Sequence, residues 1–161
     1  MIRHALLQDV PAIEKLLLRA KRRTELCTVK VNFEKGRKNI RRCIQSALGF
    51  AMVAERGEKI TGTLLAMQCE YWYSNERYVT DMGFVSYARG DGRLLLRRCR
   101  SWADAHGAKM LMGTFSLDPR GAMRRVYEGE GLYMAGHTFV SEKPINVPNI
   151  RMVPCHISST R

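Results

Sequence analysis

The stretch from Val85 to Leu96 constrains the fold more than any other segment, because an apolar strand pattern runs into a glycine-broken turn and out into an amphipathic helix. Gly90 and Gly92 lack a Cβ, so the backbone there can adopt positive φ and approach a ligand closely. The first amides of the helix point outward with the positive end of the helix dipole behind them. The pattern predicts a strand-turn-helix unit suited to phosphate, with an ordinary glycine turn as the alternative.

The size and composition of the chain favour one globular domain. It has 161 residues, of which 45% are apolar, and no run approaches the roughly 18 apolar residues that cross a bilayer. We expect a cytosolic protein with one domain over residues 1–143 and a proline-containing tail over 144–161, which either packs on that domain or is loosely attached. The five cysteines are far apart and include no CxxC pair, so neither a disulfide framework nor a metal site is expected.

Positive charge is concentrated in the first part of the chain. The net charge is +12, and residues 15–42 contain eleven Lys and Arg against Glu25 and Glu34. Such a segment indicates either an acidic partner, which includes nucleic acid, an anionic protein surface or a phosphorylated cofactor, or a solvated basic face without a partner.

The apolar periodicity and the turn residues predict a mixture of strands and helices along the whole chain. In order, we expect a strand over 2–6, a helix capped by Asp9 with Pro11 in its first turn, a helix from Phe33 or Arg37, strands over 49–55, 60–71 and 78–85, a helix from Gly92 to Gly107, a strand over 109–115, a helix over 119–128 and one or two strands within 133–143.

This order, with an Arg-Gly-x-Gly turn between the fourth strand and the third helix, resembles the GNAT superfamily of acetyl-CoA-dependent N-acetyltransferases. The resemblance spans most of the chain. It implies a single domain of the α/β (α+β) class, with a mixed, mostly antiparallel sheet of about six or seven strands and about four helices. The family signature, Arg/Gln-x-x-Gly-x-Gly/Ala, is matched from Arg89 through Gly92, and Leu94 replaces the small last residue.

By this resemblance, the cofactor is acetyl-CoA, and the backbone after the fourth strand binds its pantetheine arm and pyrophosphate. The residues implied are Val85, Arg89, Gly90, Asp91, Gly92, Arg93, Leu94 and Leu95. Two other phosphate-binding turns do not fit the sequence. A dinucleotide-binding turn would have glycine at Leu95, and a P-loop would have a Gly-Lys-Ser/Thr run, which is absent.

A second family signature lies downstream, where Tyr127 stands four residues before a Gly-Leu pair. Arg120 and Met123 replace the Asn and the small residue that often accompany it. The resemblance implies that Tyr127 donates a proton to the departing coenzyme A thiolate, a role that suits a phenol in a partly dry cleft. A tyrosine that only packs a helix on the sheet is the alternative.

Transfer of an acetyl group to an amine needs a neutral amine, so a base must accept a proton directly or through water. Asp81 is the best candidate, with Glu55 and Glu70 on neighbouring strands in reserve. Strict alternation along 78–85 places Asp81 on the face opposite Phe84, where it is an acid among apolar neighbours. A paired structural carboxylate is the equal alternative.

The acceptor is less constrained by the sequence. The aromatic residues around the turn after the third strand favour either a substrate rim or a contact between two copies in a homodimer; they are Tyr71, Trp72, Tyr73 and Tyr78. The basic first half favours a protein or peptide amine or an aminoacyl-tRNA over a small amine. A catalytically weak or inactive GNAT-like module that binds nucleic acid or an acidic protein is the alternative function, because Leu94, Arg120 and Met123 depart from the signatures.

Overall fold

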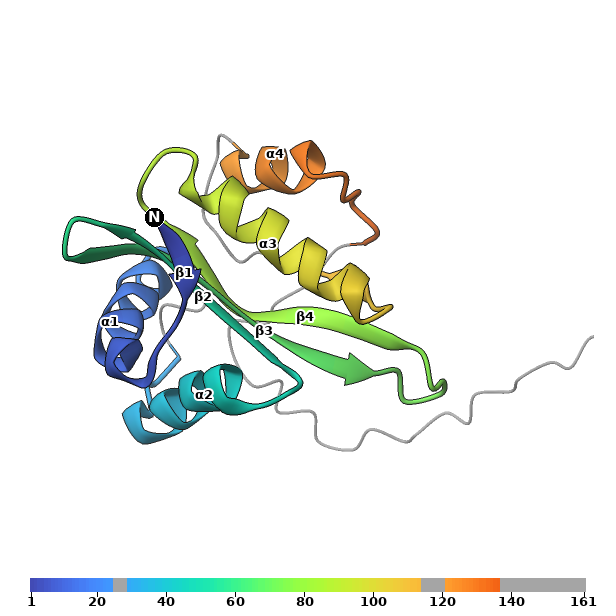
Figure 1. The fold of residues 1–161 in the computed structure, drawn as a ribbon, viewed down its shortest axis with the longest axis horizontal. Helices are drawn as coiled ribbons and strands as arrows, with labels where there is room; N and C mark the ends of the chain where they lie inside the picture. Colours follow the sequence, from blue (N-terminus) through green and yellow to red (C-terminus); the bar gives the residue numbers. More distant parts are fainter. Residues whose placement is uncertain (25–28, 114–120, 137–161) are drawn as a thin grey trace, which may run out of the picture.

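The structure, a computed structural model, describes residues 1–24, 29–113 and 121–136. A five-stranded sheet in the order β1-β2-β3-β4-β5 forms its centre (Figure 1). The strands β1 (Ile2–His4), β2 (Gly49–Arg56), β3 (Lys59–Glu70) and β4 (Arg77–Ser86) pair antiparallel, whereas β5 (Lys109–Leu111) runs parallel to β4. The predicted mixed, mostly antiparallel sheet is confirmed.

The predicted number of strands, six or seven, exceeds the five that the described residues form. The extra strands were expected within 133–143, but residues 133–136 form no strand and residues 137–143 lie outside the described part of the chain. The domain boundary expected at residue 143 lies outside it as well. Among the described helices, none is both long and apolar enough to cross a membrane.

The helices cover the two faces of the sheet (Figure 1). On one face, α1 (Val10–Lys21) and α2 (Phe33–Gln45) pack over β2 and β3 through a core that includes Ile13, Ile40 and Leu65. On the other face, α3 (Asp91–Ala105) packs through a core that includes Leu95 and Leu96, and α4 (Ala122–Gly129) lies against α3.

Local sequence signals account for the start of α2 and the end of α3. Asn32 caps α2, because its side chain accepts the backbone N–H of Lys35 at 2.9 Å, and this cap settles the start of the helix at Phe33. Gly107, with φ +62°, follows the end of α3 as predicted.

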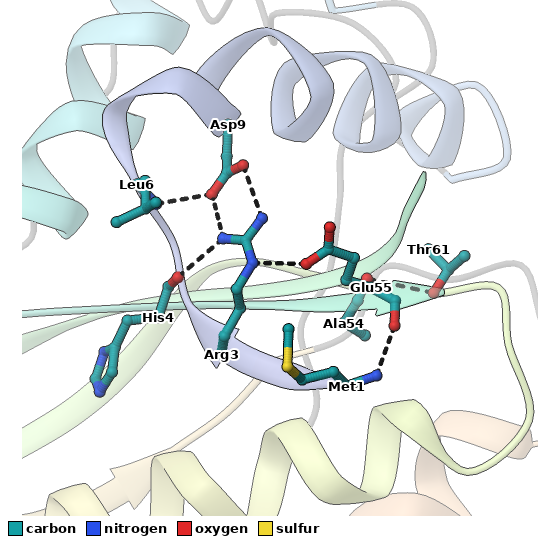
Figure 2. Close-up of polar contacts among 8 residues, drawn as sticks. All are labelled: Met1, Arg3, His4, Leu6, Asp9, Ala54, Glu55 and Thr61. Carbon is teal, nitrogen blue, oxygen red and sulfur yellow. Dashed lines mark hydrogen bonds and ion pairs between the residues drawn. The ribbon is translucent and has the colours of Figure 1, made fainter. Parts of the chain in front are cut away.

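Asp9 precedes α1 as predicted, but its carboxylate does not cap the helix (Figure 2). It instead accepts two hydrogen bonds from Arg3, at 2.6 and 3.0 Å, and one from the backbone N–H of Leu6 at 2.7 Å. Arg3 also donates to Glu55 at 2.7 Å. This network joins β1, the start of α1 and β2, and the hydrogen bonds from Arg3 lower the pKa of Asp9.

The predicted strict alternation along β4 is wrong, because the strand contains a bulge. Leu65 of β3 is opposite Gly83 and Ala66 is opposite Asp81, so Met82 has no partner across the ladder. One extra residue reverses the alternation after it. Phe84 therefore lies against the α3 side of the sheet, the side on which Asp81 lies, while Gly83 faces Leu17 of α1.

Candidate active site

The turn between β4 and α3 adopts the glycine-dependent geometry expected from the sequence. Gly90 has φ +87°, a left-handed conformation that costs other residues energy. Gly92 is required for a different reason, which is lack of space: a Cβ at this position would lie 3.3 Å from the Cβ of Ser86. One glycine reverses the chain, and the other lets the helix start close to the end of β4.

The first turn of α3 offers free backbone donors. The N–H of Asp91 donates to Ala88 at 3.3 Å and that of Leu94 donates to Gly90 at 3.2 Å. In the part of the chain that the structure describes, the N–H groups of Gly92 and Arg93 have no acceptor. Two free amides at the positive end of a 15-residue helix form an anion-binding geometry.

Asp91 is the buried anchor of this turn. Its carboxylate accepts two hydrogen bonds from Arg56, at 3.0 and 3.1 Å, and one from the hydroxyl of Thr61 at 3.2 Å. Because Arg56 ends β2 and Thr61 lies in β3, these bonds fasten the start of α3 to the β2–β3 hairpin. The hydrogen bonds from Arg56 lower the pKa of Asp91, so the group is a carboxylate at neutral pH.

The two arginines of the turn have different surroundings. Arg89 is exposed, and its side chain bonds to none of the described residues. Arg93 donates to Glu130 at 2.5 Å and to the carbonyl of Gly129 at 2.9 Å. Arg97 shares the same acid at 3.0 Å. Hydrogen bonds from Arg97 and Arg93 lower the pKa of the buried Glu130 to about 2, and the network joins α3 to the end of α4.

Of the remaining predicted cofactor residues, Val85 and Leu95 have buried side chains and Leu94 has an exposed one. The side chains of Val85 and Leu95 lie in the core, with 8% and 0% of their surface exposed, which leaves only their backbone atoms to meet a ligand. The side chain of Leu94 is 46% exposed on the surface of α3.

Asp81 and Tyr127 both bond to the backbone of one residue, Gly113. The pairing of β4 with β5 stops at Thr80 and Leu111, and Asp81 is the next residue of β4. The Asp81 carboxylate accepts the N–H of Gly113 at 2.9 Å, and the Tyr127 hydroxyl donates to the Gly113 carbonyl at 3.0 Å. The structure thus brings the predicted acid and the predicted base together where the two strands separate.

Burial raises the pKa of both groups. It raises the pKa of Asp81, an effect that the hydrogen bond from Gly113 partly offsets. Burial, and then the neighbouring Asp81 and Cys99, raise the pKa of Tyr127 well above that of a free phenol. Asp81 is therefore a stronger base than an exposed carboxylate, and Tyr127 keeps its proton at neutral pH.

The reserve bases are engaged elsewhere. Glu55 bonds to Arg3 at the β1 side of the sheet (Figure 2), and Glu70 lies 3.6 Å from Arg77 in an exposed ion pair. Within the described segments, no group of three or more His, Cys, Asp or Glu side chains could hold a metal ion. Arg120 lies outside these segments, and Met123 lies half-buried in α4.

Sequence reasoning missed the roles of Gly113, Arg56 and Glu130. The sequence did contain a signal for Glu130. Three arginines of α3, at positions 93, 97 and 100, lie on one face of the helix, and a nearby carboxylate would relieve the repulsion between them. Arg100 donates to the Glu130 carbonyl, which completes this contact. No local pattern connects Arg56 with Asp91, 35 positions away.

Comparison with known proteins gives a likeness in structure alone. No family model matches the chain, and no curated protein matches its sequence. The fold is similar to that of a predicted acetyltransferase with acetyl-CoA from Clostridium acetobutylicum, with TM-score 0.65, 17% identity, and coverage of 88% of this chain and 94% of that chain. A ribosomal-protein-alanine N-acetyltransferase from Brucella melitensis biovar Abortus has TM-score 0.63 and 12% identity, with coverage of 89% and 99%.

The likeness also extends to a protein described as a transcriptional regulator from Bacillus halodurans, with TM-score 0.65 and 23% identity, over 89% of this chain and 98% of that one. One fold can carry several functions, so identities this low establish architecture and not activity. The element order, the mixed sheet and these neighbours agree with the resemblance seen in the sequence: the chain has the fold of the GNAT acetyltransferase superfamily.

Proposed function

We propose that this protein is an acetyl-CoA-dependent N-acetyltransferase. The observation that carries the proposal is the position of Asp81 and Tyr127, which bond to the backbone N–H and the backbone carbonyl of Gly113 where β4 and β5 separate. The phosphate-binding geometry lies at the far end of the same strand, in the turn before α3. A cofactor that lies along β4 would join these two places.

The residues of the turn fit the phosphates of such a cofactor. The free amides of Gly92 and Arg93 can donate to phosphate oxygens, and the exposed Arg89 adds positive charge. The carboxylate of Asp91 bonds to Arg56 and Thr61, so its role is to hold the turn in place rather than to contact the phosphates. Acetyl-CoA, when bound, supplies the activated acetyl thioester.

The chain itself then moves two protons. The carboxylate of Asp81 accepts a proton from the acceptor ammonium or amine, directly or through a water molecule. The hydroxyl of Tyr127 donates its proton to the sulfur of the leaving thiolate and releases the carbonyl of Gly113. Each transfer is assigned to one atom, so each can be removed separately.

Calorimetric titration of acetyl-CoA into the protein tests cofactor binding, and release of coenzyme A against lysine peptides, aminoacyl-tRNA and small amines tests turnover. Tyr127→Phe is expected to lower kcat about 10²-fold or more with little change in KM for acetyl-CoA. Tyr133→Phe removes the same hydroxyl from an 85% exposed side chain and serves as the matched control. Equal activity of the two variants would remove Tyr127 from the mechanism.

Asp81→Asn tests the base through the pH profile of kcat/KM. With Asp81 as the base, activity in the parent protein rises as its carboxylate deprotonates, and the Asn variant loses that limb together with most of the rate. An unchanged profile and rate would show that Asp81 is a structural carboxylate.

A second candidate function is a GNAT-like binding module without efficient catalysis. The contacts that occupy Arg93, and the exposed Leu94 where the family has a small residue, favour it. Cofactor binding without release of coenzyme A for any amine of the panel would support this alternative, whereas turnover with one of them would exclude it. A protein or peptide amine or an aminoacyl-tRNA is the acceptor class we favour, and a cytosolic location and a homodimer stay predictions.

A further inference from the structure

The outward faces of α1 and α2 and of the turn after α1 form a basic surface to which the contacts of Asp81, Tyr127 and Gly113 do not belong. Figure 1 shows the two helices side by side on one face of the sheet, opposite α3. Eight exposed cations belong to this surface: Lys15, Arg19, Arg22, Arg23, Lys35, Lys38, Arg41 and Arg42. Among the residues that the structure describes, no carboxylate lies within ion-pair distance of any of them.

The acids of these helices do not balance this charge. Glu14 of α1 is paired with Arg37, which donates to it at 3.0 and 3.1 Å. Glu34 is the acid of α2. Of these eight side chains, that of Arg19 alone has a contact with another described side chain, since its guanidinium lies 4.5 Å from the centre of the Tyr87 ring. Unbalanced like charges repel each other, and a polyanion relieves that repulsion while it releases counterions.

An apolar hollow of about 160 Å³ lies between α1, α2 and the sheet, and Glu14, which is paired with Arg37, is the one charged residue of its lining. Its walls include Leu17, Ile40 and Leu65. Two apolar residues at its edge are unusually exposed for their type, Phe33 at 54% and Met82 at 49%. A phenyl ring in solvent, on the same helix as the exposed Lys35 and Lys38, is a stacking platform for a planar base.

Two side-chain amides complete the hollow. Asn32 and Asn39 line it. The carbonyl oxygen of Asn32 is used to cap α2, which leaves its NH₂ group to donate. Apolar walls, one exposed ring and two amides match the needs of an unstacked nucleobase, which stacks on one face and bonds through its edges. An acidic peptide would need the cations but not these groups.

We propose that the basic surface of α1 and α2 binds a single-stranded nucleic acid, with the phosphates on the cations and a base at Phe33. This proposal goes beyond acetyl transfer and does not depend on it, because binding needs neither acetyl-CoA nor the groups at Asp81 and Tyr127.

Fluorescence anisotropy of the full chain, without acetyl-CoA, tests the proposal with labelled 12-nucleotide RNA and DNA, an abasic DNA strand of equal charge, and a 12-residue polyglutamate. We expect RNA or DNA to bind at 50 mM salt, with the preferred sugar identified by the ratio of the two affinities. Binding should weaken steeply with salt, and the abasic strand and polyglutamate should bind at least about tenfold more weakly.

Variants separate the contribution of charge from that of the base. Lys38→Glu with Arg41→Glu is expected to weaken oligonucleotide binding more than tenfold and to reduce the salt slope by about 2. Arg98→Glu, an equally exposed cation on α3, is the control and should change binding less than about threefold. Phe33→Ala should weaken binding about tenfold, and Phe33→Tyr, which keeps the ring, should not.

Three results would overturn the proposal. The first is no oligonucleotide binding at 50 mM salt. The second is equal binding of a ligand without bases. If the abasic strand binds as tightly as RNA and DNA, the surface recognises charge alone, and if polyglutamate does so, the surface suits an acidic protein. The third is no difference between Phe33→Ala and Phe33→Tyr. Acetyl-CoA titration of the same variants distinguishes this failure from failure of the proposed transferase, because the surface lies across the sheet from α3.

Discussion

The contact between Asp91 and Arg56 offers a sharp test of how the fold prepares the turn before α3. The Asp91 side chain is 12% exposed and that of Arg56 is 57% exposed, so the pair lies between a surface and a buried ion pair. Hydrogen bonds to charged groups contribute about 1.5–3 kcal/mol, and exposed ion pairs about 0.2–1 kcal/mol. Two hydrogen bonds with one exposed partner give an expected coupling of about 1–2 kcal/mol.

A double-mutant cycle of Asp91→Asn and Arg56→Gln, followed by chemical denaturation, measures this coupling. For a chain of this size, Asp91→Asn should lower Tm by about 3–6 °C. The exposed pair of Arg124 and Glu128 on α4 is the control, with an expected coupling of about 0.3–0.5 kcal/mol. Acetyl-CoA affinity of Asp91→Asn, measured by calorimetry, should fall several-fold, because the turn loses its anchor.

The pH dependence provides a second readout. Arg56 lowers the folded pKa of Asp91 below its unfolded value of about 3.9, so the stabilisation is fully present above that value and is lost as pH falls through the folded pKa. The difference in stability between the parent protein and Asp91→Asn should therefore persist at pH 7 and shrink below about pH 4. A coupling below about 0.3 kcal/mol, or a difference that does not change with pH, would refute the reasoning.

Three further changes test other parts of the structure. Arg3→Met leaves the buried carboxylate of Asp9 without its main partner and should cost about 3–5 kcal/mol in urea denaturation; a loss below about 1 kcal/mol would contradict the network of Figure 2. Gly90→Ala forces a side chain to φ +87° and should cost about 1–2 kcal/mol and weaken acetyl-CoA binding, whereas an unaffected protein would show that the turn is not strained. Leu94→Gly should tighten acetyl-CoA binding in a calorimetric titration if this position faces the diphosphate, and equal or weaker binding would count against that placement.

Much of the architecture could be predicted because it depends on short-range patterns. The strand-turn-helix signal around Gly90 and the stop at Gly107 each follow from the conformation of one residue and its neighbours. The resemblance in the sequence also placed Asp81 and Tyr127 on elements that meet in the structure. Their roles in catalysis stay predictions.

The strand register and the partners of charged residues far apart in the sequence depend on the tertiary structure. The bulge at Met82 follows from how β4 pairs with β3, and it places Asp81 and Phe84, which strict alternation assigned to opposite faces, on the same face of the sheet. The side chain of Arg93, one of the predicted cofactor residues, bonds to Glu130, 37 positions away.

The order of the elements and the glycine turn follow from the sequence alone, because backbone preferences and apolar periodicity act over a few residues. Which charged groups stay free to bind a ligand depends on the tertiary structure. Asp91 and Arg93 adjoin Gly92 in the sequence, yet both side chains are bound to distant partners while the neighbouring amides stay open. A side chain bonds to whatever the fold brings within reach, and that depends on the packing of the whole domain.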